Sequence, residues 1–189
     1  MIFSHDTEEA LLSGAALVCT TASAGDGSDE LLDAEQFEQF VQRWQWTGSR
    51  GYDEDERRAV RALRPTLAAL WECSTEDEVV LLVNTWLLAG RALPQLVRHD
   101  GWGYHLHATS PDAPLATRWM VEVAMAMVDV VRAGELSRLR FCAAEDCDGV
   151  LVDLSKNRSR RFCENGCGNR TNVAAYRARR RAEEDAGDE

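Results

Sequence analysis

Two short cysteine pairs lie near the C-terminus, Cys142-Ala-Ala-Glu-Asp-Cys147 and Cys163-Glu-Asn-Gly-Cys167, and fifteen residues separate them. Zinc prefers four ligands in a tetrahedron, and two closely spaced pairs supply four sulfurs with little loss of chain entropy. We therefore predict one structural Zn²⁺ ion per chain, held by Cys142, Cys147, Cys163 and Cys167. Four unrelated core cysteines and a metal-free redox switch are the alternatives that the spacing leaves open.

The segment around the second pair predicts further local structure. Val150-Leu-Val152 and Arg160-Arg-Phe162 are expected to form two short strands, joined by the turn-like residues 155–159. A helix is expected to begin just after the second pair, near Arg170 or Thr171. A cysteine knuckle, a hairpin and a helix in this order make a treble-clef-like module.

Charge is distributed unevenly along the 189 residues. Residues 1–135 carry 10 basic and 22 acidic side chains, a net charge of −12, whereas residues 136–182 carry 11 and 5, a net charge of +6. The last seven residues carry five acids and no base. The overall charge of −11 therefore combines an acidic body, a basic module and a short acidic tail, and the module is the part suited to an anionic partner.

The segment after the second cysteine pair has one cationic face when it is wound as a helix. Four arginines then share roughly a 100° arc, at positions 170, 177, 180 and 181. Arginine has a rigid fork of donors that suits phosphate oxygens and guanine edges, and such a helix fits the major groove. We expect the following residues to contact duplex DNA: Arg160, Arg161, Arg170, Asn172, Tyr176, Arg177, Arg180 and Arg181. A solvated charged face is the alternative.

Helical periodicity dominates the first two-thirds of the chain. Apolar residues at three- and four-residue steps predict four helices, over residues 31–44, 53–71, 76–92 and 113–133. The last is apolar on nearly all sides, which predicts a central, buried helix. Pro65 should kink the second helix or split it into two. Residues 95–98 and 103–108 flank Asp100-Gly101, which predicts a β-hairpin.

Two histidines of this hairpin, His105 and His107, are two residues apart, so their side chains should point to the same side of a strand. They could bind a small ligand or a metal, or they could be ordinary hydrogen-bonded histidines. Cys19 and Cys73 have no partner nearby in the sequence and are expected to be buried and inert. The apolar core of residues 1–134 is larger than a segment that only anchors the cysteine module would need. Its size is consistent with binding of a small-molecule effector or with a homodimer interface.

Composition changes near Gly134, from apolar and acidic to basic and cysteine-rich. We expect an α+β fold that is predominantly α. Residues 1–134 should form an α-rich domain with a small β-hairpin, and residues 135–189 a zinc-binding, DNA-binding module with an acidic tail. The 55 residues after Gly134 are too few to build a core without a metal.

Several classes of protein are excluded at this stage. Hydrophobic residues make up 45% and charged residues 28%, which argues against wholesale disorder. The apolar runs are too short to span a bilayer, and the acidic start is unlike a signal peptide. The sequence contains no phosphate-binding loop or nucleophile motif that would indicate an enzyme. We therefore expect a cytoplasmic, nucleoid-associated protein with no membrane partner.

The cysteine segment resembles a known family. The motifs Arg140-Phe-Cys142, Arg160-Arg-Phe-Cys163 and Cys167-Gly-Asn-Arg170 are similar to the CGNR zinc finger of bacterial proteins. Gly103-Tyr-His-Leu-His107 and Asp112-Ala-Pro-Leu115 resemble the ABATE domain that usually precedes this finger. The resemblance implies a stress-responsive regulator of transcription. A zinc-stabilised interaction or dimerisation module without a DNA target, and a thiol redox sensor that releases zinc on oxidation, are the other functions that the residues allow.

Overall fold

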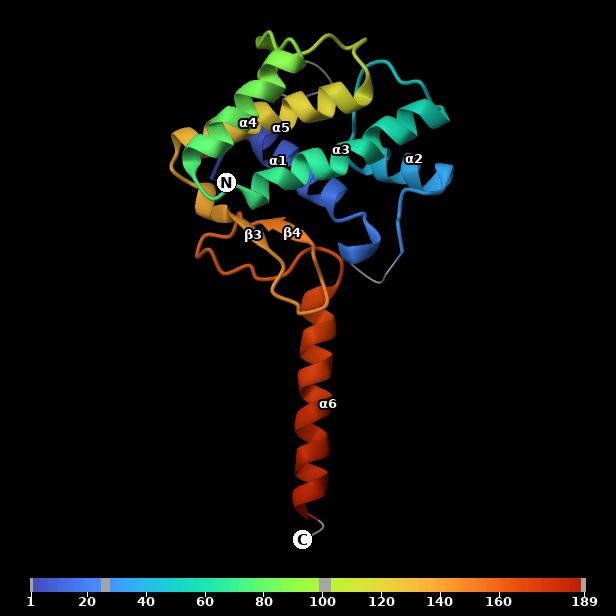
Figure 1. The fold of residues 1–189 in the computed structure, drawn as a ribbon, viewed down its shortest axis with the longest axis vertical. Helices are drawn as coiled ribbons and strands as arrows, with labels where there is room; N and C mark the ends of the chain where they lie inside the picture. Colours follow the sequence, from blue (N-terminus) through green and yellow to red (C-terminus); the bar gives the residue numbers. More distant parts are fainter. Residues whose placement is uncertain (1, 25–27, 99–102, 188–189) are drawn as a thin grey trace.

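The computed structural model describes residues 2–24, 28–98 and 103–187. In that part of the chain it has six α-helices and two small antiparallel sheets (Figure 1). The helices of the body are α1 (His5–Val18), α2 (Ala34–Arg43), α3 (Glu54–Glu72), α4 (Glu76–Ala89) and α5 (Leu115–Arg132). The other elements are the 3-10 turns η1 (Ala22–Ala24) and η2 (Leu136–Arg138), the strands β1 (Gln95–Val97), β2 (His105–His107), β3 (Leu139–Phe141) and β4 (Val150–Val152), and the helix α6 (Cys167–Gly187). The predicted fold class, α+β and predominantly α, is confirmed.

α5 is the central helix of the body, and α1, α3 and α4 all pack against it. Trp119, Met127 and Val130 of α5 are completely buried. The Trp119 ring stacks on Phe40 of α2, with 5.7 Å between ring centroids, and lies 4.7 Å from the Trp46 ring. The prediction of a buried central helix is therefore confirmed.

Capping side chains fix the starts of two other predicted helices, because they accept hydrogen bonds from backbone amides of the first helical turn. The Asp53 carboxylate accepts from the Glu56 amide at the start of α3, and Thr75 and Glu78 form a reciprocal capping box at the start of α4. Of the two effects expected of Pro65, the split into two helices is wrong, because one helix continues through this residue. Pro65 is exposed while buried Leu63 and Leu67 on either side hold the helix on the core, and this packing offsets the lost hydrogen bond.

Both sheets are two-stranded hairpins. β1 and β2 pair as predicted, with Gln95 opposite His107 and Val97 opposite His105, and the predicted turn lies outside the described residues. The predicted partner of β4 is wrong: β4 pairs with β3, with Phe141 opposite Val150, and residues 160–162 form no strand. The β3–β4 pair closes the short loop that carries the first cysteine pair. Residues 160–162 are held beside it by one backbone hydrogen bond, from the Ala143 amide to the Arg161 carbonyl at 2.8 Å, and by contacts of Arg160 with the Asp153 and Arg140 side chains.

One hydrophobic core runs from the helices into the cysteine-rich segment. The Trp71 indole of α3 donates a hydrogen bond of 3.0 Å to the Leu151 carbonyl of β4, and the Asp148 amide donates one of the same length to the Ser23 carbonyl. α6, in contrast, extends away from the rest of the molecule (Figure 1). None of the helices in the described part of the chain is long and apolar enough to cross a membrane.

Candidate metal centre and the helix that follows it

The structure brings the four cysteines of the two pairs together. Their sulfurs all lie within 4.8 Å of one another, and all four residues are buried. The Cys163 sulfur lies 3.8 Å from that of Cys147 and 3.4 Å from that of Cys167. Four sulfurs that bind one zinc ion at about 2.3 Å are about 3.8 Å apart, so the cluster has the size of a tetrahedral zinc site.

Two loops and the start of α6 position these sulfurs. The Cys142 amide donates a 2.7 Å hydrogen bond to the Gly149 carbonyl, which closes the loop of the first pair between β3 and β4. Gly149 packs tightly on the cluster, because a Cβ atom there would lie 3.1 Å from the Cys147 sulfur and 3.3 Å from that of Cys163. Cys167 is the first residue of α6, so the cluster fixes where this helix begins.

The surroundings of the sulfurs suit thiolates bound to a cation. Three N–H groups point to sulfurs, namely the amides of Gly149 and Cys163 and the guanidinium of Arg170. Burial nevertheless raises the pKa of Cys147, and it raises the pKa of Cys167 to about 11. A bound cation would offset this cost of ionisation, and four sulfur donors are a ligand set that zinc prefers.

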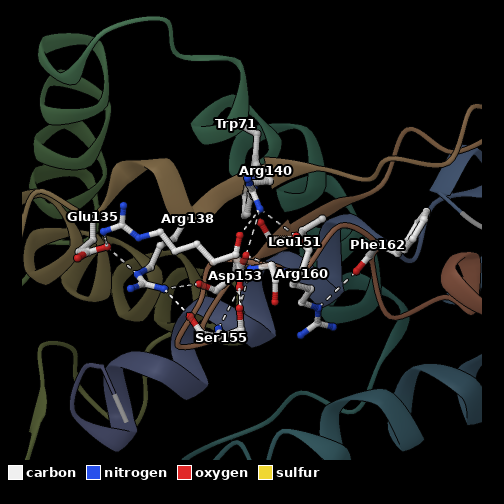
Figure 2. A network of polar contacts seen from close by, with 11 residues as sticks. Trp71, Glu135, Arg138, Arg140, Leu151, Asp153, Ser155, Arg160 and Phe162 are labelled. Atoms are coloured by element: carbon white, nitrogen blue, oxygen red, sulfur yellow. Dashed lines mark hydrogen bonds and ion pairs between the residues drawn. The ribbon is translucent and has the colours of Figure 1, made fainter.

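A buried carboxylate, Asp153, holds the loop between the two cysteine pairs (Figure 2). One of its oxygens accepts from Arg140 Nη1 at 3.1 Å and from the Arg160 amide at 2.9 Å, and the other accepts from the Ser155 amide at 3.0 Å. Burial alone would raise the pKa of Asp153, but these donors keep it below its usual value. Sequence reasoning missed Asp153, because one acid in a basic segment gives no pattern.

A fifth thiol, Cys19, lies next to the cluster. It is buried as predicted, whereas the prediction that Cys73 is buried is wrong, because Cys73 is only partly buried. The Cys19 sulfur accepts from the Val150 amide at 3.3 Å, and a hydrogen bond with Cys163 lowers the pKa of Cys19. The Asn165 side chain also donates to the Cys19 carbonyl at 2.8 Å, which ties the loop before α6 to the end of α1. Cys19 is distant in sequence from both pairs, so spacing could not reveal this contact.

α6 has almost no contact with the rest of the molecule beyond its first turn. Every described side chain from Asn169 to the C-terminus is exposed, including the apolar Val173 and Tyr176. The helix begins at Cys167, three residues before the earlier of the two predicted starts. The arginine-rich segment is therefore a solvent-exposed helix with its base anchored at the cysteine cluster.

The residues predicted to contact DNA fall into two groups. Three lie at the base and already contact the protein. Arg170 Nη2 donates to the Cys167 sulfur at 3.2 Å, Arg160 pairs with Glu164 at 3.0 Å, and Arg161 lies over the Phe162 ring. The other five lie along the exposed part of α6, and they are Asn172, Tyr176, Arg177, Arg180 and Arg181.

Comparison with protein families gives two matches. Residues 14–134 match the ABATE family, which carries the description "Putative stress-induced transcription regulator". The chain belongs to the ABATE family. Residues 138–180 match the CGNR zinc finger, so the cysteine cluster and most of α6 lie in a zinc finger that follows the ABATE domain. Both matches are of regulator and zinc-finger type, and they confirm the resemblance seen in the motifs. No curated protein is significantly similar to the chain.

The ABATE domain contains a cleft of about 1070 Å³. Residues of α1, α5, the segment after α2 and the β1–β2 hairpin line it, and both His105 and His107 are among them. His107 Nδ1 lies 3.2 Å from Glu122 Oε1 of α5, and this hydrogen bond raises the pKa of His107. Glu122 was missed because it is a single acid within an apolar helix.

Proposed function

We propose that this ABATE-family protein is a DNA-binding regulator of transcription in which Cys142, Cys147, Cys163 and Cys167 hold one structural Zn²⁺ ion and α6 contacts duplex DNA. The observation that carries the proposal is the exposed, arginine-rich α6, whose first residue, Cys167, belongs to the cysteine cluster. A protein with this activity is expected in the cytoplasm, associated with the nucleoid. Residues 1–134 would then be the sensing or dimerising part of the regulator.

The zinc ion would act as a structural element. Cys142 and Cys147 of the β3–β4 loop and Cys167 of α6 would be joined through the bound ion, and the protein's own contacts around Asp153 and Trp71 keep this base in one orientation on the body. Four thiolates and one Zn²⁺ carry a net charge of −2, which lowers the +6 of residues 136–182 to about +4. The finger therefore stays cationic when it is loaded.

The exposure of α6 favours a role in binding. A helix without an apolar face on a core is only marginally stable in water, so a partner that binds α6 would stabilise it. Arg177, Arg180 and Arg181 provide guanidinium groups suited to phosphates and guanine edges, and an α-helix fits the width of the major groove. We assign these three, with Asn172 and Tyr176 beside them, to direct contact with DNA.

The arginines at the base have a different part in the proposal. Arg170 donates to a cluster sulfur and neutralises its charge, so it would position α6. Arg160 and Arg161 lie beside the start of α6, where they would reach only the phosphate backbone. The body carries a net charge of −12, and its repulsion of DNA would confine contact to the finger.

Fluorescence anisotropy with the zinc-loaded full chain tests this function. Duplexes are first selected from a random library, and affinity is then measured at several salt concentrations. We expect the affinity to fall steeply with salt, because phosphate contacts release counterions. The double variant R177A/R180A should lose binding while its zinc content and melting temperature stay unchanged.

The matched control is R58A/R98A, which removes two exposed arginines of the body and changes the net charge equally. It should bind DNA as tightly as the wild type. Equal affinity of R177A/R180A and the wild type, or binding without a salt dependence, would contradict the proposal and would favour the zinc-stabilised protein-interaction module.

A further inference from the structure

α4 carries apolar side chains on two opposite faces. Val79, Val83 and Trp86 lie on its inner face and are buried, and the helix packs against the central helix α5. The outer face carries Leu81 and Leu88, whose exposed fractions are 70% and 81%. A helix that packs only on its own core has polar residues on its outer face, so the outer face of α4 is suited to contact with a second protein surface.

The spacing of residues on the outer face is that of a contact between helices. Asp77, Leu81, Asn84 and Leu88 follow one another at steps of four, three and four residues. Such steps place all four residues on one stripe of an α-helix, and they are the spacing of the seam in a pair of packed helices. Leu81 and Leu88 are about 10 Å apart along this stripe.

We propose that α4 forms a homodimer interface, in which the outer faces of two copies of the chain pack against each other in antiparallel orientation. The interface would give the ABATE domain a dimerising surface of its own. It is separate from the cysteine cluster and goes beyond the proposed contact of α6 with DNA.

The charges of α4 identify a second copy of the chain as the partner. The first turn of the helix carries Glu76, Asp77 and Glu78, whereas Arg91 follows the last turn. Within the described residues, no hydrogen bond or ion pair occupies the side chains of Asp77 and Arg91, and both are exposed. An antiparallel copy places the acidic end of one helix beside the basic end of the other, and twofold symmetry repeats this contact at both ends. Parallel pairing would instead bring like charges together.

The leucines and one asparagine set the register of the pair. With the twofold axis near Asn84, Leu81 of one copy lies opposite Leu88 of the other, and Asp77 of one copy lies beside Arg91 of the other. The two Asn84 amides then meet near the axis, where each can donate and accept a hydrogen bond. A single asparagine in an apolar seam fixes the register of paired helices in this way.

The position of α4 in the molecule is compatible with a dimer that binds DNA. α4 belongs to the helical body, whereas α6 extends from the opposite end of the molecule (Figure 1). A dimer formed through α4 therefore leaves the arginines of both α6 helices uncovered. Leu93 and Leu96, in the chain just after α4, are 73% and 68% exposed and add apolar surface beyond the helix.

The test is sedimentation equilibrium of the zinc-loaded full chain over a wide range of concentrations. No DNA is present, so a failure here is distinct from a failure of the proposed DNA binding. We expect the mass to rise with concentration from that of one chain, 21.1 kDa, towards twice that value. L81E/L88E should remain monomeric, because it places carboxylates in the seam. L32E/V173E, which adds the same charge at two exposed sites outside α4, should dimerise like the wild type.

A charge exchange tests the antiparallel orientation. D77R and R91D should each raise the dissociation constant of the dimer about three- to tenfold, because each brings like charges together at both ends of the contact. The double variant D77R/R91D should restore the affinity of the wild type, a result that a defect in folding would not produce. Circular dichroism and zinc content identify any variant that is misfolded.

Three results would overturn the proposal. The first is a wild-type chain that is monomeric at every concentration, which would leave this face to a different protein or to solvent. The second is a dimer that persists unchanged in L81E/L88E, because the copies would then associate through another surface. The third is a D77R/R91D variant that associates more weakly than either single variant, since the two charges would then not meet across the interface.

Discussion

The cysteine cluster and α6 are consecutive in the chain, yet different forces hold them in place. The cluster is buried, its sulfurs accept N–H hydrogen bonds, and its strands share the core of the ABATE domain. α6 shares only its first turn with that core and is otherwise exposed. The difference teaches that substitutions in the cluster should change stability, whereas substitutions in α6 should change binding alone.

The largest effect on stability is expected from the loss of one of the four cysteines that we propose as metal ligands. In C147S the zinc site loses one of four thiolates, so zinc should be released and the cysteine-rich segment should unfold. Because this segment shares its core with α1 and α3, the melting temperature of the whole chain should fall. Zinc analysis and thermal unfolding measure both effects.

C73S is the matched control for this prediction. The Cys73 thiol lies at the end of α3 and donates only to the Ala69 carbonyl, so its loss should leave zinc content unchanged. A C147S protein with full zinc content and the wild-type melting temperature would show that the cluster does not hold a zinc ion that stabilises the fold.

A smaller effect is expected at the buried carboxylate of the same base. D153A leaves the Arg140 guanidinium and the Arg160 and Ser155 amides without their acceptor, so it should destabilise the protein by about 3–5 kcal/mol. D153N keeps one acceptor oxygen and should cost less. Urea unfolding gives the free energy of unfolding of both variants and of the wild type. Equal stability of D153A and the wild type would show that the contacts of Asp153 do not stabilise the protein.

The body provides a test that depends on pH. Hydrogen bonds from Arg64, with help from the Leu31 amide and Arg61, hold the pKa of Asp29 well below its usual value. A lowered pKa stabilises the fold above the unfolded-state value of about 3.9, and this contribution is lost as the pH falls further. D29N should therefore be less stable than the wild type by about 1.5–3 kcal/mol at pH 7.

The measurement is the difference in unfolding free energy between D29N and the wild type from pH 7 to pH 3. This difference should shrink below about pH 4, because Asp29 of the unfolded wild type then takes up a proton while the folded carboxylate stays ionised. A constant difference across this range would mean that folding does not lower the pKa of Asp29.

The smallest effect is expected from the acidic tail. Deleting residues 183–189 removes five carboxylates and no base, so DNA should bind the shortened chain more tightly. The gain should be largest at low salt, where repulsion is least screened. Anisotropy measures it, and unchanged affinity at low salt would show that the tail does not compete with DNA for the arginines.

Much of the fold could be predicted because its signals are local. The Thr75 capping box, the period of α5 and the cysteine spacing each lie within a few residues, and the structure brings the four cysteines together. The β1–β2 pairing follows from a short turn in the same way. α1 was not identified as a separate helix, although the apolar residues of 10–18 carry its buried side.

The errors concern contacts between distant parts of the chain. Residues 160–162 look as suited to a strand as β3 does, and only the three-dimensional path around Asp153 decides between them. Cys19 meets Cys163 across 144 positions of sequence, and Glu122 meets His107 from a different element. Spacing and periodicity carry no information about such pairs.

Hydrogen exchange of the zinc-loaded full chain, with and without a selected DNA duplex, tests the contrast between the base and α6 most directly. We predict that amides of β3, β4 and α5 exchange slowly in both states. Amides of α6 beyond its first turn should exchange rapidly in the free protein and become protected when DNA binds. Protection of α6 in the free protein, or DNA-dependent protection confined to the body, would contradict the account.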